Sequence, residues 1–241
     1  HALIVPEKLW YFPEEAEIKA GCPLPDIFFV YGDEIKTMLE PFYPDTSFFK
    51  CCSPRFKHWK VSPDISRYLK AQNDKHIILF ANNAAIIHDD VVLRALLKFV
   101  RQELKKSVSL RLRLHPTERL KLADYLRVRA YALLHKIEIS SRSLQEDFKE
   151  ADLVVGACST VIYEALMRGI PVMGVFDDYY MRSSIIPEAF TCNMDELSLV
   201  SLEQYMNKTA DSDVVRRFKE NIGGFSPDLT TKLIYDECNI Q

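Results

Sequence analysis

The sequence lacks the features that would assign it to a membrane-spanning or nucleic-acid-binding class. Its apolar runs, such as residues 77–81, fall far short of the roughly 20 residues that a helix needs to cross a bilayer. Its 31 basic and 34 acidic side chains leave a net charge of −3, so no overall field attracts nucleic acid or anionic lipid. We therefore expect no transmembrane segment and no nucleic-acid partner, whereas peripheral association with a membrane stays open.

The N-terminus also lacks a secretory signal, because nothing there combines a basic flank, an apolar stretch and a small-residue cleavage site. The chain opens with His1 and Ala2 instead of Met, which we interpret as a tag remnant or an artificial start. Its six cysteines show no CxxC spacing, and a chain of 241 residues needs no disulfide staples. These features favour reduced thiols and a cytoplasmic location.

No cluster of His, Cys and carboxylates has the spacing of a metal site, so we expect neither a metal ion nor another cofactor. The hydrophobic fraction of 48% and the charged fraction of 27% are those of an ordinary globular protein. The length allows one large domain, or one domain with part of another.

From residue 75 onward, apolar runs of strand length alternate with longer segments of helical period, a pattern typical of βα units that build a parallel sheet. The expected strands are residues 77–81, 108–114, 137–139, 152–155 and 171–176. The expected helices are residues 89–106, 117–134, 143–150, 159–168, 201–208, 211–221 and 227–238. The sequence thus predicts an α/β fold, a Rossmann-like doubly wound parallel sheet of about five strands.

The first 74 residues differ, because they hold eight of the twelve prolines. Only two strand-like runs, residues 27–31 and 48–52, stand out there, joined by an expected helix at 33–42. That is too little for an independent domain. We interpret residues 1–74 as the remnant of an N-terminal domain with a linker that ends near Asn73, and residues 75–241 as the Rossmann-like domain.

Ligands of an open parallel sheet bind beyond the carboxyl ends of its strands, so the residues that follow each strand are the candidates for a site. His115 and Pro116 follow one strand, and Ser159 and Thr160 follow another at the start of a helix. A helix N-terminus attracts phosphate, because its first N–H groups lack partners and its dipole is positive there. Ser159 could instead only cap its own helix, and His115 could be structural.

Two further sets of polar residues favour a role outside the site. Leu110, Leu112 and Leu114 alternate with Arg111, Arg113 and His115, and we expect the two arginines on an edge strand or paired with acids. After the last strand, Asp177, Asp178, Tyr179 and Tyr180 could meet a metal, a sugar or a base, but a solvated turn is the better interpretation.

Three runs together resemble the donor-binding domain of GT-B glycosyltransferases that build bacterial surface polysaccharides. They are Arg113-Leu114-His115-Pro116, Ala151 to Gly156 with Ser159-Thr160, and Glu164 to Val172. The likeness covers residues 77–175, is greatest to the sialyltransferase, polysialyltransferase and Kdo-transferase groups, and extends weakly to Cys52-Ser53-Pro54-Arg55. It implies a C-terminal GT-B domain with a partial N-terminal segment, in which residues 75–241 would be the nucleotide-sugar-binding domain.

The resemblance also implies roles for individual residues. His115, Pro116, Ser159 and Thr160 would bind the nucleotide of a CMP-sugar, and Glu164 would accept from ribose hydroxyls. The first glutamate of the paired-glutamate motif falls at Gly156, so that motif is not intact. The acidic pair that supplies the general base is not matched by Gly32-Asp33-Glu34, and we expect the base outside this chain.

We therefore expect a glycosyltransferase that takes a nucleotide-sugar, with CMP-sugar favoured, and a glycan acceptor in capsule or lipopolysaccharide biosynthesis. His115 is the candidate for stabilising the leaving group. A CDP-glycerol or ribitol-phosphate transferase stays open, as does, more weakly, a non-hydrolysing sugar-nucleotide epimerase. A non-catalytic nucleotide-binding module is the alternative from a different class.

Overall fold

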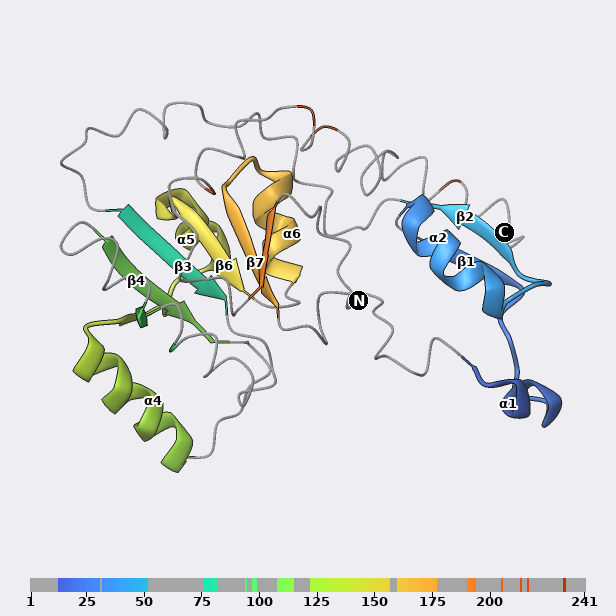
Figure 1. Ribbon diagram of the computed structural model, residues 1–241, viewed down its shortest axis with the longest axis horizontal. Coiled ribbons are helices and arrows are strands. Elements are labelled where there is room, and N and C mark those ends of the chain that lie inside the picture. Colours follow the sequence, from blue (N-terminus) through green and yellow to red (C-terminus); the bar gives the residue numbers. More distant parts are fainter. Residues whose placement is uncertain are drawn as a thin grey trace. The chain divides into compact units, whose positions relative to one another are not determined.

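The computed structural model of the chain forms two compact units, residues 1–61 with 213–241 and residues 62–212 (Figure 1). The expected boundary between residues 74 and 75 lies outside the described residues and stays a prediction. The structure describes residues 13–30, 32–51, 76–81, 94, 97, 98, 108–114, 122–156, 160–176, 190–193, 205, 213, 216 and 232.

In the first unit, residues 13–30 and 32–51 form a short α1 (Glu15–Lys19) followed by a βαβ motif. Strands β1 (Ile27–Val30) and β2 (Ser47–Lys50) pair in parallel, and α2 (Asp33–Leu39) with a 3₁₀ turn at Glu40–Phe42 connects them. The ring of Phe28 stacks on Phe48, with centroids 5.7 Å apart, and meets Tyr43 edge-on at 5.0 Å. Both strands and the helix were predicted, whereas α1 was not.

The second unit is built on a six-stranded sheet in the order β5-β4-β3-β6-β7-β8, and every pair is parallel. Its strands are β3 (His76–Ala81), β4 (Val108–Arg113), β5 (Glu138–Ile139), β6 (Leu153–Gly156), β7 (Val172–Phe176) and β8 (Thr191–Asn193). Counted along the chain this is the order 3-2-1-4-5-6 of Rossmann folds. The predicted fold class is confirmed.

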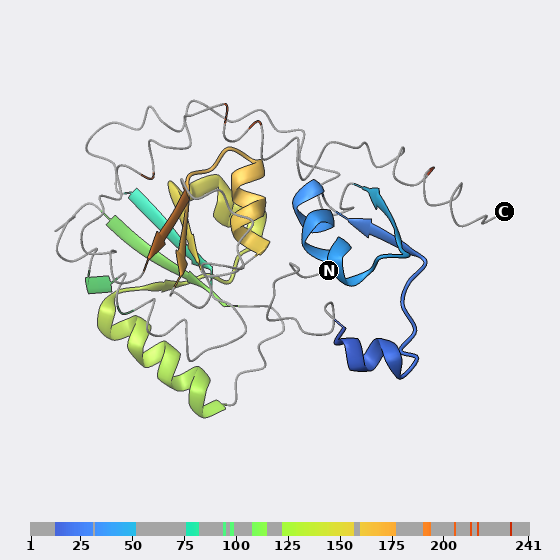
Figure 2. The ribbon, with the colours of Figure 1, turned by 45° about the vertical axis from the view of Figure 1, so that its right-hand side comes forward.

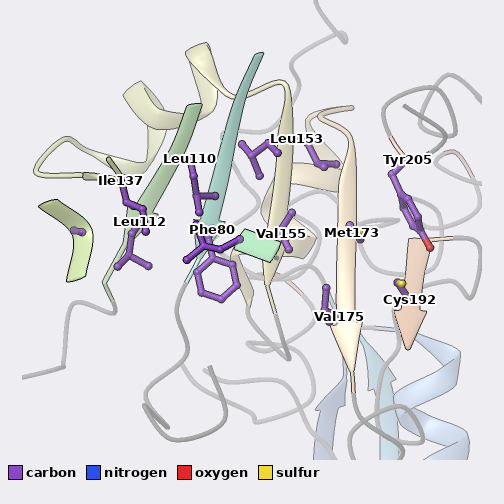
Figure 3. Packing of buried hydrophobic residues seen from close by; sticks show 13 residues of the cluster. Phe80, Leu110, Leu112, Ile137, Leu153, Val155, Met173, Val175, Cys192 and Tyr205 are labelled. Atoms are coloured by element: carbon purple, nitrogen blue, oxygen red, sulfur yellow. The ribbon is translucent and has the colours of Figure 1, made fainter. Parts of the chain in front are cut away.

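Helices cover both faces of this sheet (Figure 2). On one face, side chains of five strands form a continuous apolar core with α4 (Leu122–His135), as Figure 3 shows for Phe80, Leu112 and Val155. Tyr205 joins this core and donates its hydroxyl to the Thr191 carbonyl at 2.7 Å. The other face packs against α5 (Leu144–Glu150) and α6 (Thr160–Met167), whose Phe148, Ile162 and Leu166 are buried.

Local sequence signals set the ends of these helices. Ser143 accepts a hydrogen bond from the Glu146 amide while the Glu146 carboxylate accepts from the Ser143 amide, a capping box that starts α5. Gly169, with φ of 71°, ends α6 in the left-handed region that glycine adopts without strain. Both helices were predicted within one or two residues.

The expectation of about five strands was wrong by one, because β8 was not predicted. This strand has only three residues, Thr191, Cys192 and Asn193, and only Cys192 is buried. Among the described strands it lies at an edge of the sheet, paired with β7. A strand so short carries neither an apolar run nor an alternation that a sequence pattern can reveal.

Pairing of β3 with β6 joins the two halves of the sheet. At the amino end, the Ile77 amide donates to the Asp152 carboxylate and the Asp152 amide donates to the Ile77 carbonyl, both at 2.8 Å. At the carboxyl end, Ala81 stands opposite Gly156. A Cβ on Gly156 would lie 2.9 Å from the Ala81 carbonyl oxygen and 3.5 Å from the Ile162 side chain.

We predict that Gly156→Ala destabilises the protein, because the added methyl group meets backbone that cannot rotate away. Overpacking of this kind typically costs about 1–3 kcal/mol in the free energy of unfolding, measured by urea denaturation. An unchanged unfolding midpoint and slope would show that the two strands accommodate the added methyl group without loss of free energy of unfolding.

Candidate nucleotide site at the carboxyl edge of the sheet

The strand order reverses direction between β3 and β6, which makes their carboxyl ends the switch point of the sheet. In folds of this kind, ligands bind outside the strand ends at that point. Ala81 and Gly156 end the two strands, and the lack of a side chain at Gly156 lets the backbones approach closely. The sequence reaches α6 only four residues after Gly156.

Two of the predicted site residues lie on α6. Thr160 is its first residue and Glu164 follows one turn later, so the two share one side of the helix as predicted. Both are partly exposed, whereas Ile162, Tyr163, Ala165, Leu166 and Met167 are buried. The partly exposed side of α6 therefore begins at the carboxyl edge of the sheet with Thr160 and Glu164.

The remaining predicted residues, His115, Pro116 and Ser159, lie outside the described residues, as do Asp177, Asp178, Tyr179 and Tyr180. Their roles stay predictions. Among the residues that the structure describes, no group of three or more His, Cys, Asp or Glu side chains is arranged to hold a metal ion.

A buried carboxylate holds the two arginines of β4. Asp147 of α5 is fully buried, and it accepts from Arg111 Nη1 at 3.3 Å and from Arg113 Nη1 at 2.7 Å. The Ser140 hydroxyl lies 2.8 and 2.7 Å from the two oxygens of the same carboxylate. Of the two predicted alternatives, pairing with acids is confirmed, whereas an edge strand is wrong, because β4 lies between β5 and β3.

More acids surround the buried end of Arg111. Arg111 Nη2 donates to Glu138 at 3.0 Å and to Glu150 at 2.8 Å, and Arg142 also pairs with Glu150. Burial lowers the pKa of Arg111, but the hydrogen bonds to Glu150 and Glu138 outweigh it and leave the pKa raised. The same hydrogen bond from Arg111, helped by Arg142, lowers the pKa of Glu150.

This ion cluster, made of Arg111, Arg113, Glu138, Ser140, Arg142, Asp147 and Glu150, fixes the carboxyl half of β4. Arg113 also donates to the Arg142 carbonyl at 2.8 Å, so the last residue of the strand is held from two sides. Leu114 follows, and His115 is the next residue in the chain. The cluster is therefore suited to positioning the strand that leads to His115. The charges of its arginines are balanced by the acids of the cluster.

Two other polar residues stand at candidate positions, one in each unit. Asp33 begins α2 in the first unit, and its carboxylate accepts from Lys50 Nζ at 2.6 Å. Asn193 ends β8 at the carboxyl edge of the sheet, beside Phe176 in register. Sequence reasoning missed Asn193 because it missed the strand. The only signal in the sequence was a polar residue next to a cysteine.

Comparison with known proteins finds the fold but no sequence family. No protein-family profile and no curated protein matches the sequence. Among solved structures, sucrose-phosphate synthase from Thermosynechococcus elongatus matches with a TM-score of 0.59 at 13% identity. That match covers 92% of this chain and 60% of the synthase, so this chain spans about three fifths of the synthase.

Two other solved structures match to a similar degree. S. aureus MnaA in complex with UDP gives a TM-score of 0.60 at 16% identity, over 97% of this chain and 67% of MnaA. A UDP-forming trehalose-phosphate synthase from Burkholderia xenovorans gives 0.56 at 14% identity, over 99% of this chain and 67% of the synthase. At such identities the likeness shows the fold alone, an α/β Rossmann-like fold of the kind found in GT-B structures.

We predict that Asp147→Asn lowers the free energy of unfolding by about 3–5 kcal/mol, because it leaves two arginines short of a buried counter-charge. The matched control is Asp213→Asn, since Asp213 also pairs with an arginine, Arg216, but is 62% exposed. Loss of an exposed pair should cost no more than about 1 kcal/mol. Equal effects of the two substitutions on urea unfolding would contradict the importance of the buried cluster.

We predict that Glu150 makes stability fall in acid. Its pKa is lowered in the folded protein, so its contribution is fully present above the unfolded value of about 4.5 and is lost as pH falls through the lower folded value. The carboxylate is partly exposed, so solvent screening keeps the contribution small. Glu150→Gln should therefore reduce stability at neutral pH, and the difference from the wild type should vanish in acid.

The control for that measurement is Glu15→Gln, because Glu15 pairs with Lys19 on the exposed surface of α1. Loss of so exposed a pair should change the free energy of unfolding by no more than about 1 kcal/mol. A Glu150→Gln protein whose stability parallels the wild type at every pH would contradict the assignment.

Proposed function

We propose that this chain binds the donor nucleotide of a GT-B glycosyltransferase, with a CMP-sugar as donor and a surface glycan as acceptor. The observation that carries the proposal is the switch point between β3 and β6, where Gly156 permits close approach of the strands and Thr160 starts a helix four residues later. This geometry supports nucleotide binding, because phosphate is favoured at such a helix N-terminus.

The cytidine preference is supported by the motifs of the sequence. His-Pro at residues 115–116 and Ser-Thr at 159–160 resemble the pairs that hold cytidine monophosphate in the sialyltransferase-like groups. Two of the matched structures point elsewhere, since MnaA was solved with UDP and the trehalose-phosphate synthase is a UDP-forming enzyme. A direct comparison of nucleotides therefore decides the donor class.

The proposed chemistry is departure of a nucleotide phosphate from the anomeric carbon of the sugar. Negative charge develops on that phosphate, and His115, Ser159, Thr160 and the first amides of α6 would stabilise it. A preorganised donor of this kind contributes about 2–4 kcal/mol to lowering the barrier. Binding energy on the nucleotide would hold the anomeric carbon in line with the acceptor hydroxyl.

Glu164 has a supporting part in this proposal. It stands one turn beyond Thr160 on the partly exposed side of α6, where a carboxylate can accept from ribose hydroxyls. Gly156 stands where the first glutamate of the paired-glutamate motif would fall, so the proposed ribose contact rests on Glu164 alone.

We predict that CMP raises the melting temperature of the protein, that GDP does not, and that EDTA leaves the CMP effect intact. Ligand at a hundred times its dissociation constant adds about 2.7 kcal/mol to stability. His115→Ala and Ser159→Ala should each weaken CMP binding without changing the melting temperature of the free protein by more than a lost helix cap allows. The double variant should lose less affinity than the sum, because both groups would contact one phosphate.

The control is His76→Ala, since His76 is the first residue of β3 and lies at the amino end of that strand, opposite the proposed site. It should leave CMP affinity per folded molecule unchanged, even where stability falls. A preference for UDP or GDP would overturn the CMP-sugar assignment, and unaltered affinity in both site variants would overturn the phosphate site. Binding with no sugar transfer by any preparation would favour the non-catalytic module, and transfer of glycerol phosphate from CDP-glycerol would favour that alternative.

A further inference from the structure

Helix α4 presents an apolar stripe to solvent. Leu133 is 83% exposed, Leu134 is 76% exposed and Leu126 is 56% exposed, and Tyr125 adds a partly exposed ring. Across the described residues only Ile18 and Phe42 are other large apolar side chains of comparable exposure, and each stands in a different element. Exposed apolar side chains gathered on one helix mark a surface that meets something other than water.

The stripe is distinct from the side that attaches α4 to the sheet. Ala132 belongs to the buried core and Val128 and Tyr131 pack against it. At 3.6 residues per turn, Leu126, Ala130, Leu133 and Leu134 fall within an arc of about 100° on the opposite side of the helix. Packing against the sheet therefore does not explain the outer leucines.

Cations stand on both sides of this stripe. Arg127 is exposed along one margin and Arg129 along the other, where its guanidinium lies 5.2 Å from the centre of the Tyr125 ring. Exposed Lys136 follows the end of the helix. Residues 122–136 hold one acidic residue, Asp124, against Arg127, Arg129 and Lys136, although the whole chain carries a net charge of −3. The outer face of α4 is thus an apolar stripe with basic margins on a protein whose charges nearly balance.

We propose that the outer face of α4 docks on the surface of an anionic lipid bilayer. The leucines would enter the boundary between headgroups and acyl chains, while the arginines would reach lipid phosphates on either side. Both features contribute, because neither a few apolar side chains nor a few cations alone bind a membrane firmly. The helix would lie in the plane of the surface, and none of the helices described in the structure is long and apolar enough to cross a bilayer.

Charge favours a bilayer over a second copy of the chain. In a symmetric dimer the same surface faces itself, so Arg127, Arg129 and Lys136 would meet their own like charges. An anionic bilayer instead offers both an apolar interior for the leucines and negatively charged headgroups for the arginines. The proposal does not involve nucleotide binding, and its test contains no nucleotide.

The experiment is co-sedimentation of the full chain with vesicles of phosphatidylcholine alone and of phosphatidylcholine with phosphatidylglycerol in equal parts. We expect binding to the anionic vesicles that weakens with salt, and little binding to the neutral ones. Leu133→Gln with Leu134→Gln should reduce the partition coefficient about tenfold or more, from the apolar area no longer buried. Arg127→Gln with Arg129→Gln should reduce it to a similar extent, since each cation near an anionic surface favours binding about fivefold.

The matched control is Ile18→Gln, which removes a large exposed apolar side chain from another helix and should leave vesicle binding unchanged. Melting temperatures of all variants should equal that of the wild type, since the substituted side chains are exposed. Absence of binding to anionic vesicles overturns the proposal, as does binding that both double variants retain. A change of oligomeric state in the leucine variant, seen by light scattering, would assign the stripe to a second copy instead.

Discussion

Parallel pairing of β3 with β6 holds the two halves of the six-stranded sheet together. On one side of this pair the chain runs outward through β4 to β5, and on the other through β7 to β8. At the amino end Asp152 makes two hydrogen bonds to the backbone of Ile77, one through its carboxylate and one through its amide, and at the carboxyl end the lack of a side chain at Gly156 lets the strands approach closely. The arrangement that gives the sheet its continuity also creates the point where ligands of such folds bind.

Electrostatics in this protein is local. With a net charge near zero, the positive charges of Arg111 and Arg113 are met by Asp147, Glu138 and Glu150 within one cluster beneath the carboxyl end of β4. These arginines therefore orient a strand. A nucleotide phosphate would therefore bind to helix α6 and to the proposed side chains after β4 and β6. The helix dipole and hydrogen bonds would stabilise the charge of the ligand there.

The elements that were predicted correctly are those with strong patterns. Strands β3, β6 and β7 are apolar runs, β4 alternates leucine with arginine, and α5 has a capping box, so local residues determine these elements. Strand β8 and helix α1 were missed because both are too short to show a hydrophobic period. Strand β8 has three residues at the edge of the sheet, and α1 has five residues in a proline-rich region. Pairing of the arginines with acids was predicted, but not the partners, since Asp147 lies 36 positions after Arg111 and reaches it only through the packing of α5.

For the site, sequence reasoning placed Thr160 and Glu164 on one side of a helix, which the structure confirms. It did not consider Asn193, whose place depends on the edge strand. Hydrogen exchange of the chain with and without CMP tests the central claim most directly. Slower exchange of amides in peptides from 112–118 and 155–162, with no change in α4, is the predicted result. Protection that appears only elsewhere, or none at saturating CMP, would contradict a nucleotide site at the junction of β3 and β6.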